Sequence, residues 1–182
     1  MEATQIDTEK YWFAMRDLKR TNALLPAYKQ LDELGMEVFT PMTTRFSKKE
    51  GKRVRVEVPV MHDLLFVKEN RQNLDPIVAK TPTLQYRFKK GGKQGEPIII
   101  PNEDMERFIC AVRASNNPKF YAPEEITPLL CGRKIRMIGG TLDGYEGILQ
   151  TVRGSKTKHL IITLPSLLAV SVDINNEFIE VI

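Results

Sequence analysis

The residues from 131 onward consist almost entirely of short apolar segments that end at glycine-containing turns. The turn signals are Gly139-Gly140, Asp143-Gly144 and Gly154-Ser155. Several short strands with such turns between them are typical of a small β-barrel, and roughly 50 residues are enough to form one. The expected strands are Lys134–Ile138, Gly147–Val152, His159–Leu164, Ala169–Asp173 and Phe178–Val181.

Residues 117–130 differ from the segments on either side in proline content and in hydrophobic periodicity. Pro118, Pro123 and Pro128 lie in a stretch that has little helical or strand periodicity. Proline-rich segments of this kind commonly separate domains and act as stiff spacers. We therefore predict a linker over 117–130, followed by the barrel over 131–182.

The first 116 residues mix strand and helix patterns, which predicts an α+β domain with an antiparallel sheet and packed helices. Valine alternates with polar residues from Val54 to Val60, and Lys49-Glu50-Gly51 marks a turn, so Thr43–Val60 is expected to form a long hairpin. The other expected strands are Tyr11–Met15, Met36–Pro41, Met61–Val67, Leu84–Phe88 and Ile98–Ile100, and the expected helices are Thr21–Leu34, a short one starting at Asp75-Pro76 and one capped by Asn102.

The net charge of +4 is unevenly distributed along the chain. Residues 1–116 hold 20 Lys/Arg and 16 Asp/Glu, whereas residues 117–182 hold 7 of each. Six basic residues fall within Arg45–Arg55 and four within Arg87–Lys93. Such stretches attract phosphate or another acidic partner, although lysines on a solvated hairpin edge also serve to prevent aggregation.

The sequence has few cysteine and histidine residues and lacks recognisable catalytic motifs. Cys110, Cys131, His62 and His159 have no metal-ligand spacing, so neither a metal site nor a cofactor is expected, and His159 is expected to be solvated. No nucleophile elbow or phosphate-binding loop is present, which argues against an enzyme. The polar amino terminus does not resemble a signal peptide, and no apolar run is long enough to cross a membrane. We expect a cytoplasmic protein with reduced thiols.

Residues 132–148, GRKIRMIGGTLDGYEGI, carry a recognisable pattern. A glycine precedes an alternating strand, and Gly140, Gly144 and Gly147 follow where the chain reverses. This segment resembles the KOW motif, which also occurs in ribosomal proteins.

The order of features over residues 10–182 is similar to that of the NusG family of transcription elongation factors. An aromatic strand, a helix, VFTPM at 38–42, a basic hairpin and the strand PVMHDLLFV at 59–67 precede the KOW-like segment. This order resembles an NGN domain over 1–116 followed by a KOW domain. The TPM sequence and the hairpin length resemble the specialised RfaH-like and UpxY-like operon antiterminators more than housekeeping NusG.

The resemblance implies that the NGN domain binds the clamp helices of the largest RNA polymerase subunit through an apolar surface on its sheet. It also implies that the hairpin lies near the upstream or non-template DNA of the transcription bubble. The implied polymerase-binding residues are Trp12, Met15, Met61, Leu64 and Phe66, although all could instead be ordinary core residues. The implied nucleic-acid-binding residues are Arg16, Lys19, Arg20, Arg45, Lys48, Lys49, Lys52 and Arg53.

In relatives the KOW domain recruits another protein, such as a small-subunit ribosomal protein or a termination factor. Leu142, Tyr145, Leu164 and Leu167 are the candidate contacts here, with barrel core as the equal alternative. The resemblance thus predicts a monomeric, non-enzymatic antitermination factor that reduces pausing. The competing hypotheses are a ribosome-associated or general RNA-binding KOW protein, which the neutral C-terminal region disfavours, and a small enzyme.

Overall fold

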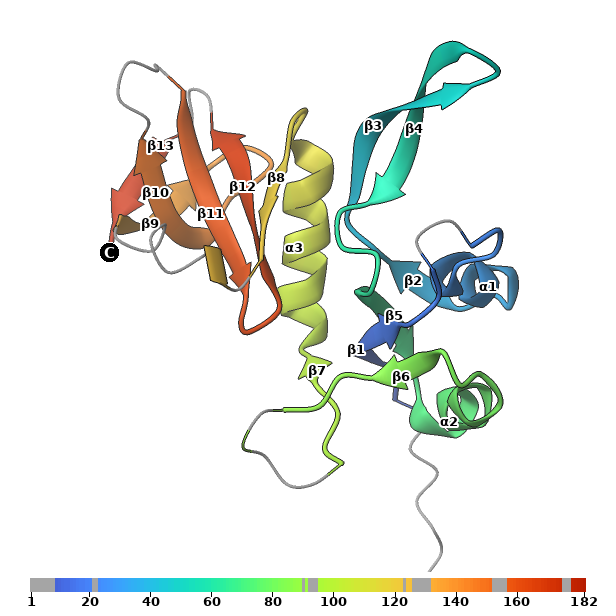
Figure 1. Ribbon diagram of the computed structural model, residues 1–182. Helices are drawn as coiled ribbons and strands as arrows, with labels where there is room; N and C mark the ends of the chain where they lie inside the picture. The colour runs from blue at the N-terminus through green and yellow to red at the C-terminus, as the bar shows by residue number, and fades with distance from the viewer. Residues whose placement is uncertain are drawn as a thin grey trace, which may run out of the picture. The chain divides into compact units, whose positions relative to one another are not determined.

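The computed structural model divides the chain into two compact units, Met1–Asn102 and Glu103–Ile182 (Figure 1). It describes residues 9–20, 23–89, 91, 95–122, 124–125, 132–151, 157–174 and 178–182. The α+β class predicted from the sequence is confirmed, because both units combine helix and sheet. The division lies earlier than the predicted linker at 117–130. Among the described residues, no helix is long and apolar enough to cross a membrane.

The N-terminal unit is built on an antiparallel sheet in which β1 and β5 are the inner strands. The strand order is β2-β5-β1-β6, and β7 pairs with β1 beside β6. The strands are β1 (Tyr11–Asp17), β2 (Glu37–Phe39), β5 (Leu65–Glu69), β6 (Leu84–Tyr86) and β7 (Ile99–Ile100). The register Phe13↔Val67 and Met15↔Leu65 places large apolar side chains opposite each other on one face.

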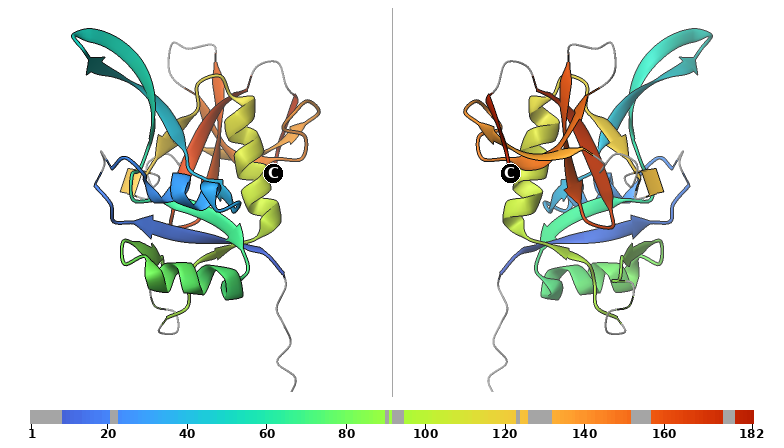
Figure 2. Two further views of the ribbon diagram at one scale, coloured as in Figure 1. Left: turned by 90° about the vertical axis from the view of Figure 1, so that its right-hand side faces the viewer. Right: turned by 90° about the vertical axis from the view of Figure 1, so that its left-hand side faces the viewer.

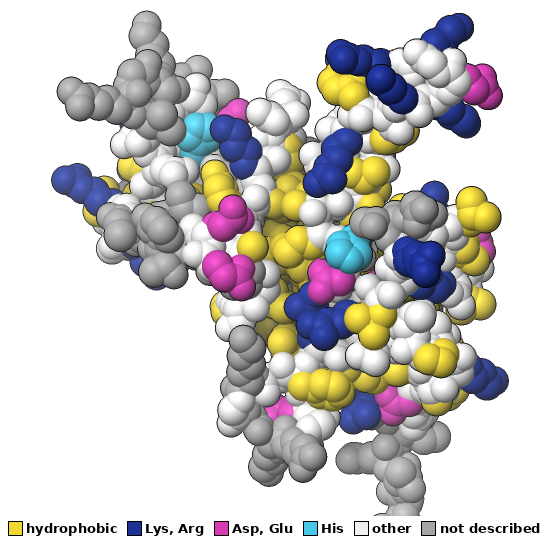
Figure 3. Space-filling model, viewed as in Figure 1, with side chains coloured by type: hydrophobic (Ala, Val, Ile, Leu, Met, Phe, Trp, Pro, Cys, Tyr) yellow, Lys and Arg dark blue, Asp and Glu magenta, His cyan; other side chains and the backbone are white. Residues whose placement is uncertain are grey.

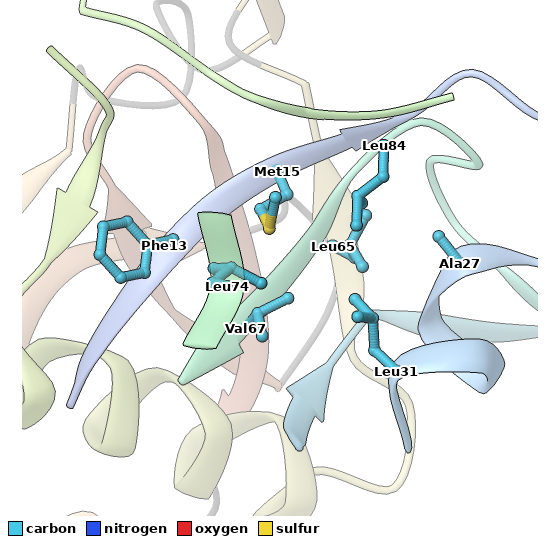
Figure 4. Close-up of a cluster of buried hydrophobic side chains, with 8 residues drawn as sticks. All are labelled: Phe13, Met15, Ala27, Leu31, Leu65, Val67, Leu74 and Leu84. Carbon is cyan, nitrogen blue, oxygen red and sulfur yellow. The ribbon is translucent and has the colours of Figure 1, made fainter. Parts of the chain in front are cut away.

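Two helices, α1 (Ala27–Glu33) and α2 (Arg71–Lys80), pack on that face of the sheet. Figure 4 shows the resulting core, in which side chains from β1, β5 and β6 meet side chains from both helices. Each of its members exposes at most 2% of its surface. The cluster consists of Phe13, Met15, Ala27, Leu31, Leu65, Val67, Leu74 and Leu84.

Helix α1 is shorter than the predicted helix over Thr21–Leu34. It begins after Pro26, because proline disfavours helical geometry in the residue before it and is itself tolerated only at a helix start. Leu24, which lies within the predicted helix but before the observed one, is 99% exposed. The predicted end is confirmed, since Gly35 has a φ of 77° directly after the last turn.

Helix α2 begins before the predicted Asp75-Pro76 start. Asn70 caps it, and its side-chain oxygen accepts a hydrogen bond from the backbone N–H of Asn73 at 2.9 Å. Pro76 therefore lies inside the helix rather than at its first position. Asp75-Pro76 has the pattern of a helix start, but Asn70, directly after strand β5, caps the helix earlier in the chain.

The predicted hairpin is confirmed as β3 (Met42–Lys49) and β4 (Lys52–Pro59), which pair along their whole length. Glu50 and Gly51 form the turn, and both have positive φ, as a type I′ hairpin turn requires. The side chains from Thr44 to Glu57 are all exposed. Figure 2 shows the hairpin extending away from the sheet of its own unit.

The C-terminal unit contains α3 (Asn102–Ala114) and a six-stranded antiparallel sheet in the order β13-β9-β10-β11-β12-β8. The five strands predicted there are confirmed as β9 (Arg133–Ile138), β10 (Glu146–Thr151), β11 (Lys158–Leu164), β12 (Leu168–Ile174) and β13 (Phe178–Val181). The sixth, β8 (Lys119–Tyr121), pairs with β12 from within the predicted linker. No pairing among the described residues joins the edge strands β13 and β8.

The glycines in and around the β9–β10 pair are required for two different physical reasons. Gly140 and Gly144 have φ of 72° and 75°, which other residues rarely adopt. Gly132 and Gly147 instead lie against a neighbouring strand, where an added Cβ would collide with the carbonyl oxygens of Leu149 and Ile161 respectively. Glycine therefore allows positive φ at two of these positions and close approach of the strands at the other two.

Candidate functional site

The sheet of the N-terminal unit has a second face, opposite the core cluster of Figure 4. Ala14 pairs with Phe66, and Phe66 pairs with Phe39, so these side chains share that second face with Trp12. We call Trp12, Ala14, Phe39 and Phe66 the aromatic face. The Phe39 and Phe66 rings lie 6.3 Å apart between centroids.

Met15 does not belong to the aromatic face, in contrast to the prediction that groups it with Phe66. Its side chain lies in the core beneath the helices and is completely buried. The physical reason is the two-residue period of a strand, which turns Met15 and Phe13 to one side and Trp12 to the other. Of the neighbouring aromatic residues Trp12 and Phe13, Phe13 belongs to the core cluster beneath the helices.

Lys68 places a positive charge beside Trp12. Its ammonium lies 5.8 Å from the centre of the Trp12 ring and 3.8 Å from a Glu37 carboxylate oxygen. The indole N–H of Trp12 is buried and has no hydrogen-bond acceptor among the described residues. In the full chain Trp12 and Phe66 expose at most 1% of their surface.

Met61 and Leu64 precede β5 instead of forming its first half, which corrects the predicted strand Met61–Val67. They belong to a turn in which the Leu64 N–H donates to the Met61 carbonyl at 3.3 Å. The Thr40 hydroxyl donates to the Leu64 carbonyl at 2.8 Å and holds the turn beside β2. Leu64 is buried and Met61 is half-buried, and both precede β5, the strand that carries Phe66.

The hairpin carries the predicted cations Arg45, Lys48, Lys49, Lys52 and Arg53, and the pairing distributes them over two faces. Residues directly opposite each other project from the same side of the ribbon. Arg45 and the pair Lys49↔Lys52 share one face with Val54 and Val56. The pair Lys48↔Arg53 shares the other with the pair Phe46↔Arg55. Figure 3 shows the Lys and Arg side chains gathered along the hairpin.

The cations predicted at the end of β1 have different roles. Arg16 is exposed, with its Nε 3.8 Å from a carboxylate oxygen of Asp63. The Lys19 ammonium donates to the Leu25 carbonyl and to Gln30, both at 2.8 Å, and so ties α1 to the end of β1. Arg20 is exposed. Of the three, Lys19 thus serves the fold, and Arg16 and Arg20 remain at the surface.

Arg87 begins the basic stretch Arg87–Lys93 noted in the sequence, but its partner in the fold is a carboxylate. It donates to the Asp63 carboxylate at 2.9 Å and to the Asp63 carbonyl at 3.1 Å. Burial lowers the pKa of Arg87, and the Asp63 carboxylate opposes this effect. The two residues are distant in the chain and share no motif, so only the fold reveals that Asp63 joins Arg87 to Arg16.

The apolar residues predicted to bind a partner of the C-terminal unit are mostly buried. Leu142, Leu164 and Leu167 expose at most 4% of their surface, which agrees with the core alternative. Tyr145 is half-buried, and burial together with the Cys110 thiol raises its pKa to about 12. The exposed apolar residues of this sheet lie elsewhere, with Ile138 paired to Phe178 at 47% and 80% exposure.

His159 is not the solvated residue that was expected. It lies directly across from Asp173 in the β11–β12 pair, with its Nδ1 2.8 Å from a carboxylate oxygen. Its side chain is 14% exposed. Cys131 lies outside the described residues, and so does most of the Gly-rich loop in the basic stretch Arg87–Lys93.

A comparison with protein families finds one match in the N-terminal part of the chain. The family model described as transcription termination factor NusG matches residues 10–109. This range contains the aromatic face, the whole hairpin, and Asp63 with its partners Arg16 and Arg87. No curated protein matches the chain.

Proposed function

The chain belongs to the NusG family, and from this premise we propose that it is an elongation or antitermination factor that acts on RNA polymerase. Members of this family generally bind RNA polymerase. The single observation that carries the proposal is the match over residues 10–109, more than half of the chain. We infer that the protein acts in the cytoplasm and by binding alone, without catalysis or a cofactor.

The proposed polymerase-binding surface is the aromatic face together with Leu64 and Met61. Family resemblance implies the clamp helices of the largest subunit as its partner. An apolar sheet surface rich in aromatic side chains suits a helical partner, because such residues dominate the energy of protein interfaces. Trp12, Leu64 and Phe66 are buried in the full chain, so binding through them requires this face to become exposed.

The proposed nucleic-acid-binding surface is the β3–β4 hairpin, with Arg16 and Arg20 as further cations. The five predicted hairpin cations are exposed, and no carboxylate among the described residues forms an ion pair with any of them. They are therefore available to phosphates. Upstream duplex or the non-template strand of the bubble is the partner that the family resemblance implies.

The proposed role of the C-terminal unit is recruitment of a second protein through a KOW-type domain. The turn glycines and the five confirmed strands support this proposal. A small-subunit ribosomal protein or a termination factor is the partner implied by the resemblance. The TPM segment at 40–42 and the hairpin length further favour a specialised, operon-directed factor, and a gene position at the head of a long polysaccharide operon would support it.

Capture of core RNA polymerase by the tagged full chain tests the main proposal. We expect wild-type protein to retain the polymerase and Phe66→Glu to lose it. Because Phe66 is buried, the variant must first show wild-type circular dichroism and a cooperative unfolding transition. Glu33→Gln, an exposed change at the end of α1, is the matched control and should retain the polymerase. Failure of the wild type to capture polymerase would refute the proposal.

A further inference from the structure

We propose that one face of the β3–β4 hairpin binds an unpaired nucleic-acid strand by stacking a base on the Phe46 ring. Arg55 lies opposite that ring, and Lys48 and Arg53 form the next pair on the same face, where all three would hold the adjacent phosphates. We call these four residues the Phe46 face. The inference rests on the proposed function of the hairpin and deepens it, because it names the form of nucleic acid and the side chain on which a base stacks.

The first observation is the exposure of Phe46. Its side chain is 69% exposed, although a phenylalanine normally contributes to a core. The hairpin is a two-stranded ribbon whose side chains from Thr44 to Glu57 are all exposed on both sides. No core therefore exists at this end of the hairpin for Phe46 to join. An exposed aromatic ring on a basic ribbon is a candidate stacking platform for a nucleic-acid base.

The second observation is the register, which places cations opposite Phe46 and on one side of it. Arg55 is directly opposite, and its guanidinium carbon lies 5.7 Å from the centre of the ring. The pair Lys48↔Arg53 follows two residues further along on the same face, about 7 Å away by the rise of a strand. Glu57 is the acidic residue of this face, one pair away on the other side. The face thus keeps an excess of positive charge around its aromatic ring.

Together these features match single-stranded nucleic acid better than duplex. A base offers its π face to a protein ring only where it is unpaired and unstacked, and such stacking tolerates any base sequence. The guanidinium of Arg55 can add stacking and phosphate contact at the same time. Duplex DNA would use the cations but leave Phe46 without a partner.

The opposite face of the hairpin provides an internal comparison. Arg45, Lys49 and Lys52 give it the same number of cations, but its apolar residues are the valines Val54, Val56 and Val58. It can attract phosphates but has no ring on which a base can stack. The two faces therefore differ in aromatic character while their basic residues are matched.

The test measures binding of the full chain to a mixed-sequence 15-nucleotide DNA strand, the same RNA strand and the corresponding DNA duplex over a range of salt concentrations. Phe46→Leu keeps an apolar residue but removes the ring, and Phe46→Tyr keeps the ring. We expect Phe46→Leu to weaken single-strand binding at least fivefold, with the salt slope and duplex binding unchanged. Phe46→Tyr should bind within about twofold of wild type.

Matched variants separate stacking from charge. Arg55→Gln and Arg45→Gln each remove one positive charge from the hairpin. Both should reduce the magnitude of the single-strand salt slope, by up to about 0.7 if a phosphate contact is lost. Only Arg55→Gln should also weaken the complex further when the salt dependence is extrapolated to high salt. Val56→Ala, on the opposite face, is the apolar control and should bind like wild type.

Three results would overturn the inference. They are absence of single-strand binding by wild type, wild-type binding by Phe46→Leu, and an equal loss of single-strand and duplex binding in that variant. The last result would mean that the Phe46 ring maintains the structure of the hairpin and does not stack on a base. A preference for DNA over RNA would identify the displaced strand of the bubble as the ligand of the Phe46 face, and the reverse preference would identify the transcript. Either preference supports stacking. Polymerase capture is scored separately, so failure of the proposed function remains distinguishable.

Discussion

The Asp17 carboxylate, at the end of β1, accepts a hydrogen bond at 2.7 Å from the backbone N–H of Ala27, the first residue of α1. Its other oxygen accepts from the Lys19 N–H at 2.9 Å. Pro26 offers no side-chain cap, so Asp17, a strand residue ten positions before Ala27, caps the helix. The connection between the first strand and the first helix thus depends on one buried carboxylate.

Asp17→Ala should lower the free energy of unfolding by about 2 kcal/mol. The change leaves the Ala27 N–H buried without an acceptor and removes a charged hydrogen bond. Urea denaturation followed by circular dichroism measures the effect. Asp32→Ala, which changes an exposed carboxylate on α1, is the control and should shift stability by less than about 0.5 kcal/mol. Equal effects of the two changes would contradict the capping role.

Glu69 should make the N-terminal unit less stable in acid. Burial alone raises the pKa of Glu69, but hydrogen bonds from the Asn70 N–H and from Lys10 and Asn73 outweigh it, and the pKa falls below its ordinary value of 4.5. The carboxylate therefore stabilises the fold above about pH 4.5, and this contribution is lost as the pH falls through the lowered folded pKa.

Glu69→Gln isolates this contribution. The amide keeps the shape of the side chain but cannot form the ion pair with Lys10, whose ammonium lies 2.9 Å from Glu69 in the wild type. Urea denaturation of both proteins should show a stability gap at pH 7 that narrows at about pH 3. A gap that stays constant between the two pH values would show that ionisation of Glu69 does not contribute.

Asp63→Asn should destabilise the N-terminal unit by about 1–2 kcal/mol, because it leaves the half-buried Arg87 guanidinium without a charged partner. Thermal unfolding monitored by circular dichroism measures this loss. Glu103→Gln removes an exposed ion pair with Arg107 and provides the control, at about 0.5 kcal/mol or less. If both variants unfold like wild type, Asp63 has no organising role at Arg87.

Gly147→Ala should destabilise the C-terminal sheet by roughly 3 kcal/mol. The new methyl group would collide with the Ile161 carbonyl and lie 2.8 Å from a methyl of Leu160, so the β10–β11 pair would have to separate. Gly139→Asn is the matched control. Gly139 has positive φ in open space, and asparagine tolerates that conformation better than other residues. Chemical denaturation of the full chain compares the two.

Periodic patterns in the sequence identified most elements correctly. The hairpin, the five C-terminal strands and the end of α1 at Gly35 follow from alternation and from turn residues, which act over a few neighbouring positions. Some differences from the predicted elements have local causes, such as Pro26 before α1 and the Asn70 cap of α2, and others depend on residues distant in the chain. Helix α1 begins where Asp17 can cap it, and β8 exists because β12 offers an edge for pairing.

The sequence alone determined the family of the chain, its strand-rich C-terminal region and the concentration of basic residues on one hairpin. These properties depend on residue type and spacing, which short-range sterics and hydrophobic periodicity translate directly into structure. Only the tertiary structure decided that Met15 is a core residue while Phe66 lies on the opposite face of the sheet. It also decided that Asp63 joins two arginines and that the Arg55 guanidinium lies beside the Phe46 ring. Those relations depend on strand register and on contacts between residues distant in the chain, which no local pattern encodes.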